Sequence, residues 1–251
     1  MKPAIALQLY TLREWAQEDF EAMVRYVADQ GYVGVEPAGF PGSTPEAAGK
    51  LFKELGLQVP SAHTALPLGD AKNEVLDAMA AIGCPRVVTG KGPDDFNTLD
   101  KIKATCDLFN EASAVVKAAG LTFGIHNHWW EYTPVDGVYP YQVMLERLDP
   151  GILFEIDTYW VQTGGCDVTQ VLKEVGERAP LLHIKDGPCV KEEPMTAVGA
   201  GVMDVPTIVA ASGDIAEWLI VEQDRTAGDM VADVAASYAY LVGEGLARGN
   251  T

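Results

Sequence analysis

The chain has 251 residues, 48% of them hydrophobic, and carries 18 basic against 36 acidic residues, for a formal net charge of −18. Its length and apolar content suffice for a substantial core, and no run of about 18 apolar residues could span a membrane. The acidity and the lack of a basic stripe argue against a typical duplex-binding protein, so we expect no nucleic-acid partner.

The cysteines and the N-terminal segment indicate a cytoplasmic protein. The four cysteines, Cys84, Cys106, Cys166 and Cys189, are widely spaced and form no C-x-x-C motif, which favours reduced thiols over a disulfide framework. The apolar run near the start is brief and continues into a strand-like segment, which argues against a signal peptide.

Short apolar runs alternate with amphipathic segments along the chain. The apolar runs predict strands at Ala4–Leu9, Val33–Val35, Gln58–Ala62, Arg86–Val88, Leu121–Ile125, Ile152–Ile156, Leu181–Ile184 and Trp218–Val221. The amphipathic segments predict helices at Phe20–Asp29, Pro45–Leu55, Asn73–Ile82, Leu99–Ala119, Tyr141–Leu148, Val168–Val175, Val205–Ala210 and Met230–Leu246. Thr44 and Pro45 suit a helix start, and Gly56 and Gly120 suit helix ends.

This alternation predicts an α/β fold built from parallel β/α units. Eight strands and eight helices average roughly 31 residues per unit, the size of a (β/α)8 barrel. A doubly wound open sheet is the alternative, but no G-x-G-x-x-G follows the first strand, which weakens its dinucleotide-binding version. No low-complexity linker divides the chain, so we expect one domain over residues 1–251.

Polar residues follow most of the predicted strands, where a barrel of this kind carries its active site. They include Glu36, His63, His126, His128, Glu155, Asp157, His183, Lys185, Glu222 and Gln223. Buried charges without partners are costly, so stability alone does not explain acids or histidines at so many strand ends. One divalent cation could be the shared partner of several of these side chains.

The segment Gly124–Tyr132, GIHNHWWEY, holds two of the four histidines. A strand alternates its faces, so His126 and His128 point one way and Asn127 the other. Such a histidine pair, with Glu131 close behind, can hold a metal or transfer protons. A pair of hydrogen-bonded structural histidines is the alternative.

Six motifs occur in order along nearly the whole chain: LQLYTLR, GIHNHWWEY, FEIDTYWV, LLHIKDG, VGAGVMD and IVEQDR. In this set the sequence resembles the sugar phosphate isomerases/epimerases, which are xylose-isomerase-like TIM barrels and include inosose dehydratases and ketose 3-epimerases. The resemblance implies a TIM barrel that binds a small sugar or keto-sugar substrate. It is compatible with a homo-oligomer.

The resemblance also implies one divalent metal ion, Mn, Zn, Co or Mg, held by Glu, Asp, His and Glu from strands five to eight. Asp157, His183 and Glu222 match the last three of these ligands. The first glutamate is replaced by His126, so either His126 is the ligand or Glu131 reaches in and frees His126 for proton transfer. We favour Glu131.

The implied activity is a metal-dependent sugar isomerase or epimerase that acts through an enediolate beside a sugar carbonyl. His126 or His128 suits the base, and Lys185 an electrophile near a substrate oxygen. Ketose 3-epimerases of the family use carboxylates for proton transfer, whereas this chain has histidines at strand five. The alternative is therefore a lyase or dehydratase acting on an inosose or 3-keto sugar, including glycoside elimination. Less favoured are a non-catalytic sugar-binding barrel and an endonuclease-IV-like DNA repair enzyme, which needs more histidines and a basic groove.

Substrate contacts are expected from residues near the same strand ends. These are Glu36, His63, Trp160 and Gln223. Trp129, Trp130, Tyr159 and Trp160 could stack on a sugar ring, although packing in the core or rim explains each equally well. Glu155 shares the face of Asp157 two residues earlier, and we expect it one layer deeper, paired with Lys or Arg. The VGAGVMD stretch is a candidate anion-binding loop.

Overall fold

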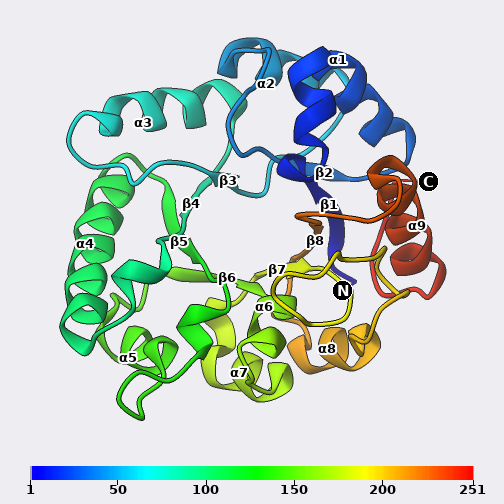
Figure 1. The fold of residues 1–251 in the computed structure, drawn as a ribbon. Coiled ribbons are helices and arrows are strands. Elements are labelled where there is room, and N and C mark those ends of the chain that lie inside the picture. Colours follow the sequence, from blue (N-terminus) through cyan, green and yellow to red (C-terminus); the bar gives the residue numbers. More distant parts are fainter. Residues whose placement is uncertain (1, 251) are drawn as a thin grey trace.

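The computed structural model describes residues 2–250, and within this range eight parallel strands form a barrel surrounded by helices (Figure 1). The strands are β1 Ala4–Gln8, β2 Gly34–Glu36, β3 Ala62–His63, β4 Arg86–Thr89, β5 Thr122–His126, β6 Leu153–Asp157, β7 Leu181–Ile184 and β8 Trp218–Val221. The predicted (β/α)8 barrel is therefore confirmed. Its extent as one domain over residues 1–251 stays a prediction.

Helices cover the outside of the barrel (Figure 1). They are α1 Arg13–Asp29, α2 Pro45–Glu54, α3 Ala71–Ile82, α4 Leu99–Ala118, α5 Pro140–Arg147, α6 Thr158–Thr163, α7 Val168–Val175, α8 Val205–Ser212 and α9 Met230–Gly243. Short 3-10 helices lie at Leu9–Leu12, Pro93–Asp95, Trp130–Tyr132 and Gly176–Arg178. Thr44 caps α2 as predicted, because its Oγ1 accepts a hydrogen bond from the Ala47 amide at 3.2 Å.

The third strand and the first helix differ from the prediction for reasons that are local in the sequence. The third strand is shorter than the predicted Gln58–Ala62, because Pro60 has no amide to donate to a neighbouring strand. Helix α1 begins earlier than expected but is interrupted at Asp19, whose backbone is extended and whose Oδ1 accepts from the Ala22 amide at 2.9 Å.

The barrel closes between β2 and β3 through backbone hydrogen bonds. The ladder order runs β2-β1-β8-β7-β6-β5-β4-β3, which leaves these two strands to be joined. The Val35 amide donates to the Gln58 carbonyl at 2.9 Å, and the His63 amide donates to the Pro37 carbonyl at 2.8 Å. These bonds complete the ring.

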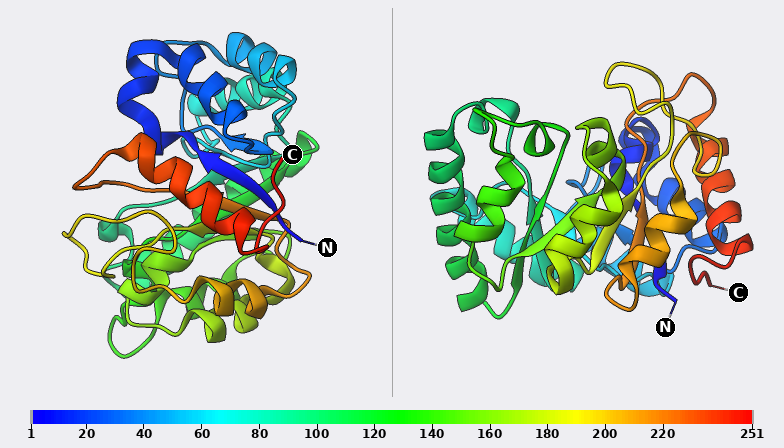
Figure 2. Two further views of the ribbon diagram at one scale, coloured as in Figure 1. Left: turned by 90° about the vertical axis from the view of Figure 1, so that its right-hand side faces the viewer. Right: turned by 90° about the horizontal axis from the view of Figure 1, so that it is seen from below.

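The loops after β7 and β8, in yellow and orange, project from one end of the barrel, where the strands end (Figure 2). The strand register sets His126 beside Glu155 and Asp157 beside His183 at this end. The apolar side chains of the strands form the core below and outside these residues. No helix in the described range, 2–250, is long and apolar enough to cross a membrane.

Candidate active site

Four buried side chains from adjacent strands converge at the mouth of the barrel. His126, Asp157, His183 and Glu222, from the ends of β5 to β8, each offer one nitrogen or oxygen atom, and these atoms all lie within 4.8 Å of one another. Two carboxylates and two imidazoles at this spacing could hold a divalent cation. The predicted ligands Asp157, His183 and Glu222 are thus brought together, with His126 as the fourth member.

The two carboxylate oxygens of Asp157 have different partners. Its Oδ1 accepts a hydrogen bond from the Trp160 amide at 2.9 Å and so caps α6, a helix the sequence patterns do not predict. Its Oδ2 accepts no hydrogen bond from the described residues but lies 2.9 Å from the ammonium of Lys185. Burial raises the pKa of Asp157 to about 6.

His183 is fully buried between carboxylates. Its Nδ1 lies 2.8 Å from Glu222 Oε2, and its Nε2 lies 2.6 Å from Glu36 Oε2. Although burial disfavours the imidazolium, Glu155, Glu36 and Glu222 raise the pKa of His183 well above its ordinary value. To bind a metal, His183 has to release a proton from one nitrogen, and metal binding favours that release.

Glu155 forms the floor of the cluster. Its Oε2 lies 2.5, 3.3 and 3.2 Å from nitrogens of His63, His126 and His183, so its partners are histidines rather than the expected Lys or Arg. These four residues form a second group whose atoms could hold a cation. Burial, followed by the charge of Glu36, raises the pKa of Glu155 to about 7.

Lys185 supplies a buried positive charge beside the cluster. Its Nζ lies 2.9 Å from Asp157 Oδ2, 2.7 Å from Glu222 Oε2 and 2.8 Å from Asp224 Oδ2. Burial opposes this charge, but the three carboxylates raise the pKa of Lys185 well above its ordinary value. A divalent cation would compete with Lys185 for Asp157 and Glu222. Asp224 lies in neither group, so it could keep the ammonium paired.

The two histidines of β5 and its following turn have different surroundings. Nδ1 of His126 accepts or donates no hydrogen bond among residues 2–250, and its ring packs against His183. The His128 ring stacks on Trp130 with centroids 4.2 Å apart. Burial, then the charge of Lys185, lowers the pKa of His128 to about 3, so its ring is neutral near pH 7.

Glu131, the fourth ligand favoured from sequence, lies in neither group of potential ligands. Its Oε2 accepts a hydrogen bond from the His128 amide at 2.9 Å, because the 3-10 helix Trp130–Tyr132 turns the side chain back toward the end of β5. Burial raises the pKa of Glu131 to about 8. The geometry thus favours His126 over Glu131, and it gives Glu131 a role in holding the backbone of His128.

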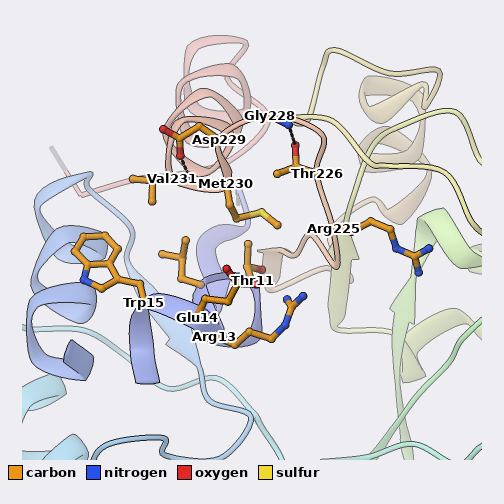
Figure 3. A pocket seen from close by; sticks show the side chains of 11 residues that line it. Thr11, Arg13, Glu14, Trp15, Arg225, Thr226, Gly228, Asp229, Met230 and Val231 are labelled. Carbon is orange, nitrogen blue, oxygen red and sulfur yellow. Dashed lines mark hydrogen bonds between the residues drawn. The ribbon is translucent and has the colours of Figure 1, made fainter. Parts of the chain in front are cut away.

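The cluster opens into a central cavity of about 260 Å³, lined by His63, His126, His128, Lys185 and Glu222 among others. Two larger spaces flank it: a mainly apolar one of about 650 Å³ between β3 and α3, and one of about 470 Å³ beside the tryptophans. A groove of about 590 Å³ lies farther out, between the start of α1 and the segment before α9 (Figure 3). The converging side chains therefore line the smallest of these spaces.

The residues expected to contact substrate lie at different depths. His63 lines the central cavity, and Trp160 lines the neighbouring space of about 470 Å³. Glu36 is fully buried beneath His183. Gln223 donates from Nε2 to Asp233 Oδ2 at 2.9 Å, in the first turn of α9 rather than in the cavity.

The sequence patterns gave no catalytic or ligand role to Glu155 or Asp224, which complete the charge pattern of the site. Glu155 lies two residues before Asp157, and this period of two placed it on the face of Asp157 from the sequence. Asp224 lies in a bend beyond the end of β8, where strand alternation gives no signal.

The VGAGVMD stretch is not available to a substrate anion, because the chain fills it with its own carboxylate. Asp186 accepts hydrogen bonds from the amides of Gly187 at 2.8 Å, Gly199 at 2.9 Å, Gly201 at 3.1 Å and Met203 at 3.0 Å. A Cβ at Gly201 would lie 2.1 Å from Asp186 Oδ1, so this close approach requires glycine. Asp186 thereby shapes the loop between β7 and α8.

Comparison with known proteins agrees with this architecture. The model of the family described as "Xylose isomerase-like TIM barrel" matches residues 24–239. A sugar phosphate isomerase/epimerase from Parabacteroides distasonis superposes with a TM-score of 0.83 at 24% identity, covering 99% of this chain and 96% of that one. No functionally curated protein matches the sequence.

Two further solved structures show the same fold. The probable 3-DHS dehydratase AsbF from Bacillus anthracis has a TM-score of 0.76 at 12% identity, covering 96% of this chain and 99% of that one. The IOLI protein, solved with a zinc atom, has a TM-score of 0.73 at 14% identity, covering 97% and 99% of the two chains. At these identities the likeness concerns the fold alone.

Proposed function

Because this chain belongs to the xylose isomerase-like TIM barrel family, we propose that it is a divalent-metal-dependent sugar isomerase or epimerase that acts at a carbon beside a sugar carbonyl. One observation carries the proposal. His126, Asp157, His183 and Glu222 converge within 4.8 Å at the ends of four successive strands. The zinc atom in the similarly folded IOLI protein supports a metal, and the isomerase/epimerase from Parabacteroides distasonis supports the reaction class.

We assign the four converging residues as the metal ligands. Two carboxylates and two imidazoles suit zinc or a similar ion, and His126 Nε2 and Asp157 Oδ2 lie 3.9 Å apart, which leaves room for an ion between them. When bound, a divalent ion would polarise a carbonyl and a neighbouring hydroxyl of the sugar and stabilise negative charge that develops on oxygen.

We assign the proton transfer to His128. Its imidazole lines the central cavity, and its Nδ1 has no hydrogen-bond partner among the described residues. Glu131 holds the backbone amide of His128, and Trp130 stacks on its ring, so the base has a fixed position. Lys185 lines the same cavity, and a metal that takes Asp157 and Glu222 would free its ammonium to donate a hydrogen bond to a substrate oxygen.

The test is proton exchange in deuterated water. The metal-loaded protein, incubated with a panel of keto-sugars, is expected to incorporate deuterium at the carbon beside the carbonyl, and a chelator should stop the exchange until metal is restored. Mass spectrometry and NMR measure the exchange. Exchange that continues at full rate with chelator would refute metal dependence, and no exchange on any keto-sugar would refute the reaction class.

A lyase or dehydratase is the second candidate, supported by the similarly folded probable 3-DHS dehydratase. Removal of the same proton, followed by departure of a leaving group from the next carbon, would give an unsaturated ketone instead of an isomer. The exchange experiment separates the two. A deuterated product with an unchanged carbon and oxygen count identifies an isomerase or epimerase, and a product that has lost water or an alcohol identifies a lyase.

A further inference from the structure

Three cationic side chains surround the cavity beside the central one, although the chain as a whole is strongly acidic. This outer cavity, of about 470 Å³, is lined by Arg13, Lys191 and Arg225 together with the tryptophans. It shares Tyr10, His128 and Asp224 with the central cavity, so the two spaces adjoin. A ligand that reaches the proposed base can therefore extend among these cations.

The two arginines are held by backbone carbonyls. Arg13 donates to the carbonyls of Tyr10 at 3.1 Å and Asp224 at 2.8 Å, and Arg225 donates to the carbonyl of Lys191 at 3.0 Å. A guanidinium has five N–H donors, so both arginines keep donors for a ligand. Figure 3, in which both are labelled, shows the two guanidinium groups on the same side of the neighbouring groove.

The carboxylates at the outer cavity do not balance these charges. Glu192 Oε2 lies 3.9 Å from the Arg225 guanidinium, and the Glu192 side chain is 95% exposed, so the solvent screens this pair. Asp224 directs Oδ2 to the ammonium of Lys185 at 2.8 Å. Three cations thus line the cavity with two carboxylates, of which Asp224 is paired with Lys185 and Glu192 is only weakly held by Arg225.

An aromatic wall completes the outer cavity. Trp129 and Trp130 lie with ring centroids 5.4 Å apart, and Trp160 lines the same space. The Lys191 ammonium lies 3.2 Å from the centroid of the Trp129 ring, which keeps the charge at the cavity although no carboxylate of residues 2–250 pairs with it. Aromatic faces bind the apolar side of a sugar ring, and guanidinium groups bind phosphate or carboxylate oxygens in pairs.

We propose that the outer cavity binds an anionic group, a phosphate or a carboxylate, that the substrate carries away from its reacting carbon. The inference rests on the proposed function only for the place of that carbon, in the central cavity. The loop after β7 offers no substitute, because Asp186 already accepts its amide hydrogens. The chain therefore prefers a sugar phosphate or a sugar acid to the corresponding uncharged sugar.

Inorganic phosphate is the first probe, because its binding needs no turnover. Quenching of tryptophan fluorescence at constant ionic strength should show saturable binding to the intact protein. Arg225→Gln should weaken this binding roughly 10- to 100-fold. Arg147→Gln is the matched control, since its side chain is 41% exposed against 42% for Arg225, and it pairs with Asp107 far from the cavity. The control should bind phosphate as the unchanged protein does.

Two more variants separate phosphate binding in the outer cavity from misfolding and from binding at the metal. Lys191→Met keeps the apolar stem and should also weaken phosphate binding, which covers the case in which Arg225→Gln does not fold. Asp157→Asn tests whether phosphate binds the metal instead, and it should leave phosphate binding unchanged. The proposal is overturned if phosphate does not bind saturably, if Arg225→Gln and Arg147→Gln bind it equally, or if only Asp157→Asn weakens it.

A second set of probes identifies the anion. Glucose 6-phosphate, glucuronate and glucose present the same ring with a phosphate, a carboxylate or no charge. Tighter binding of the first or the second than of glucose supports the inference and names the group, and equal binding of all three overturns it. If the three ligands bind equally, the protein can still catalyse deuterium exchange on uncharged keto-sugars. If exchange is not observed, the outer cavity can still bind phosphate. The two proposals are therefore tested separately.

Discussion

Asp157→Asn is expected to abolish turnover and to weaken metal binding by more than about 100-fold, beyond the roughly 10- to 100-fold effect of losing a residue that only orients a ligand. Asparagine keeps an oxygen that can accept the Trp160 amide and so preserve the cap of α6. It removes the negative charge that faces the cluster. Metal titration and assays of the same preparations measure both effects.

Asp167→Asn is the matched control for this experiment. Asp167 also caps a helix, α7, by accepting a hydrogen bond from the Gln170 amide at 2.9 Å, but it is exposed and lies outside both groups of potential ligands. Its variant should bind metal and turn over substrate normally. Equal metal binding by the Asp157 and Asp167 variants would contradict the assignment of Asp157 as a ligand.

His128→Gln is expected to lower turnover by about 10²- to 10⁴-fold, the usual effect of losing a general base, while metal binding is retained. The physical reason is that His128 lines the central cavity but lies outside the group formed by His126, Asp157, His183 and Glu222. Rates of deuterium exchange and metal content, measured on the same samples, test both parts.

The same substitution two residues earlier should behave differently. His126→Gln removes a proposed ligand, so metal binding and turnover should fall together. If His128→Gln instead lost the metal, His128 would be a ligand. If His128→Gln exchanged the substrate proton at the unchanged rate, the base would be another group in the cavity.

The strands were predictable because strands of a parallel barrel are buried on both faces and form short continuous apolar runs. β7 and β8 have the predicted bounds, and β5 is displaced by one residue. Helix α6 was not predictable from periodicity. It begins immediately after β6 and has only six residues, and its start depends on the Asp157 carboxylate that caps it.

Strand alternation predicted part of the site. It predicted that His126 and His128 would face the same way, and both line the central cavity. It also placed Asn127 on the opposite side, where its side chain bonds the backbone of Asp157. The direction of Glu131 could not be predicted, because it depends on the turn at Trp130–Tyr132 rather than on a repeating pattern.

Contacts across the barrel could not be predicted from the sequence either. Glu36 and His183 are 147 residues apart, and their 2.6 Å contact depends on how the strands are staggered around the ring. The same stagger brings His63 to Glu155. Two cations of the outer cavity, Lys191 and Arg225, come from loops, whose paths are not fixed by apolar periodicity, and the third, Arg13, begins α1.

The most direct test of the central claim is anomalous diffraction from crystals of the metal-loaded protein. We expect one strong peak at the mouth of the barrel, about 2.0–2.3 Å from nitrogen or oxygen atoms of His126, Asp157, His183 and Glu222. A peak coordinated by Glu131 in place of His126, or no peak at the cluster at full metal loading, would contradict the account.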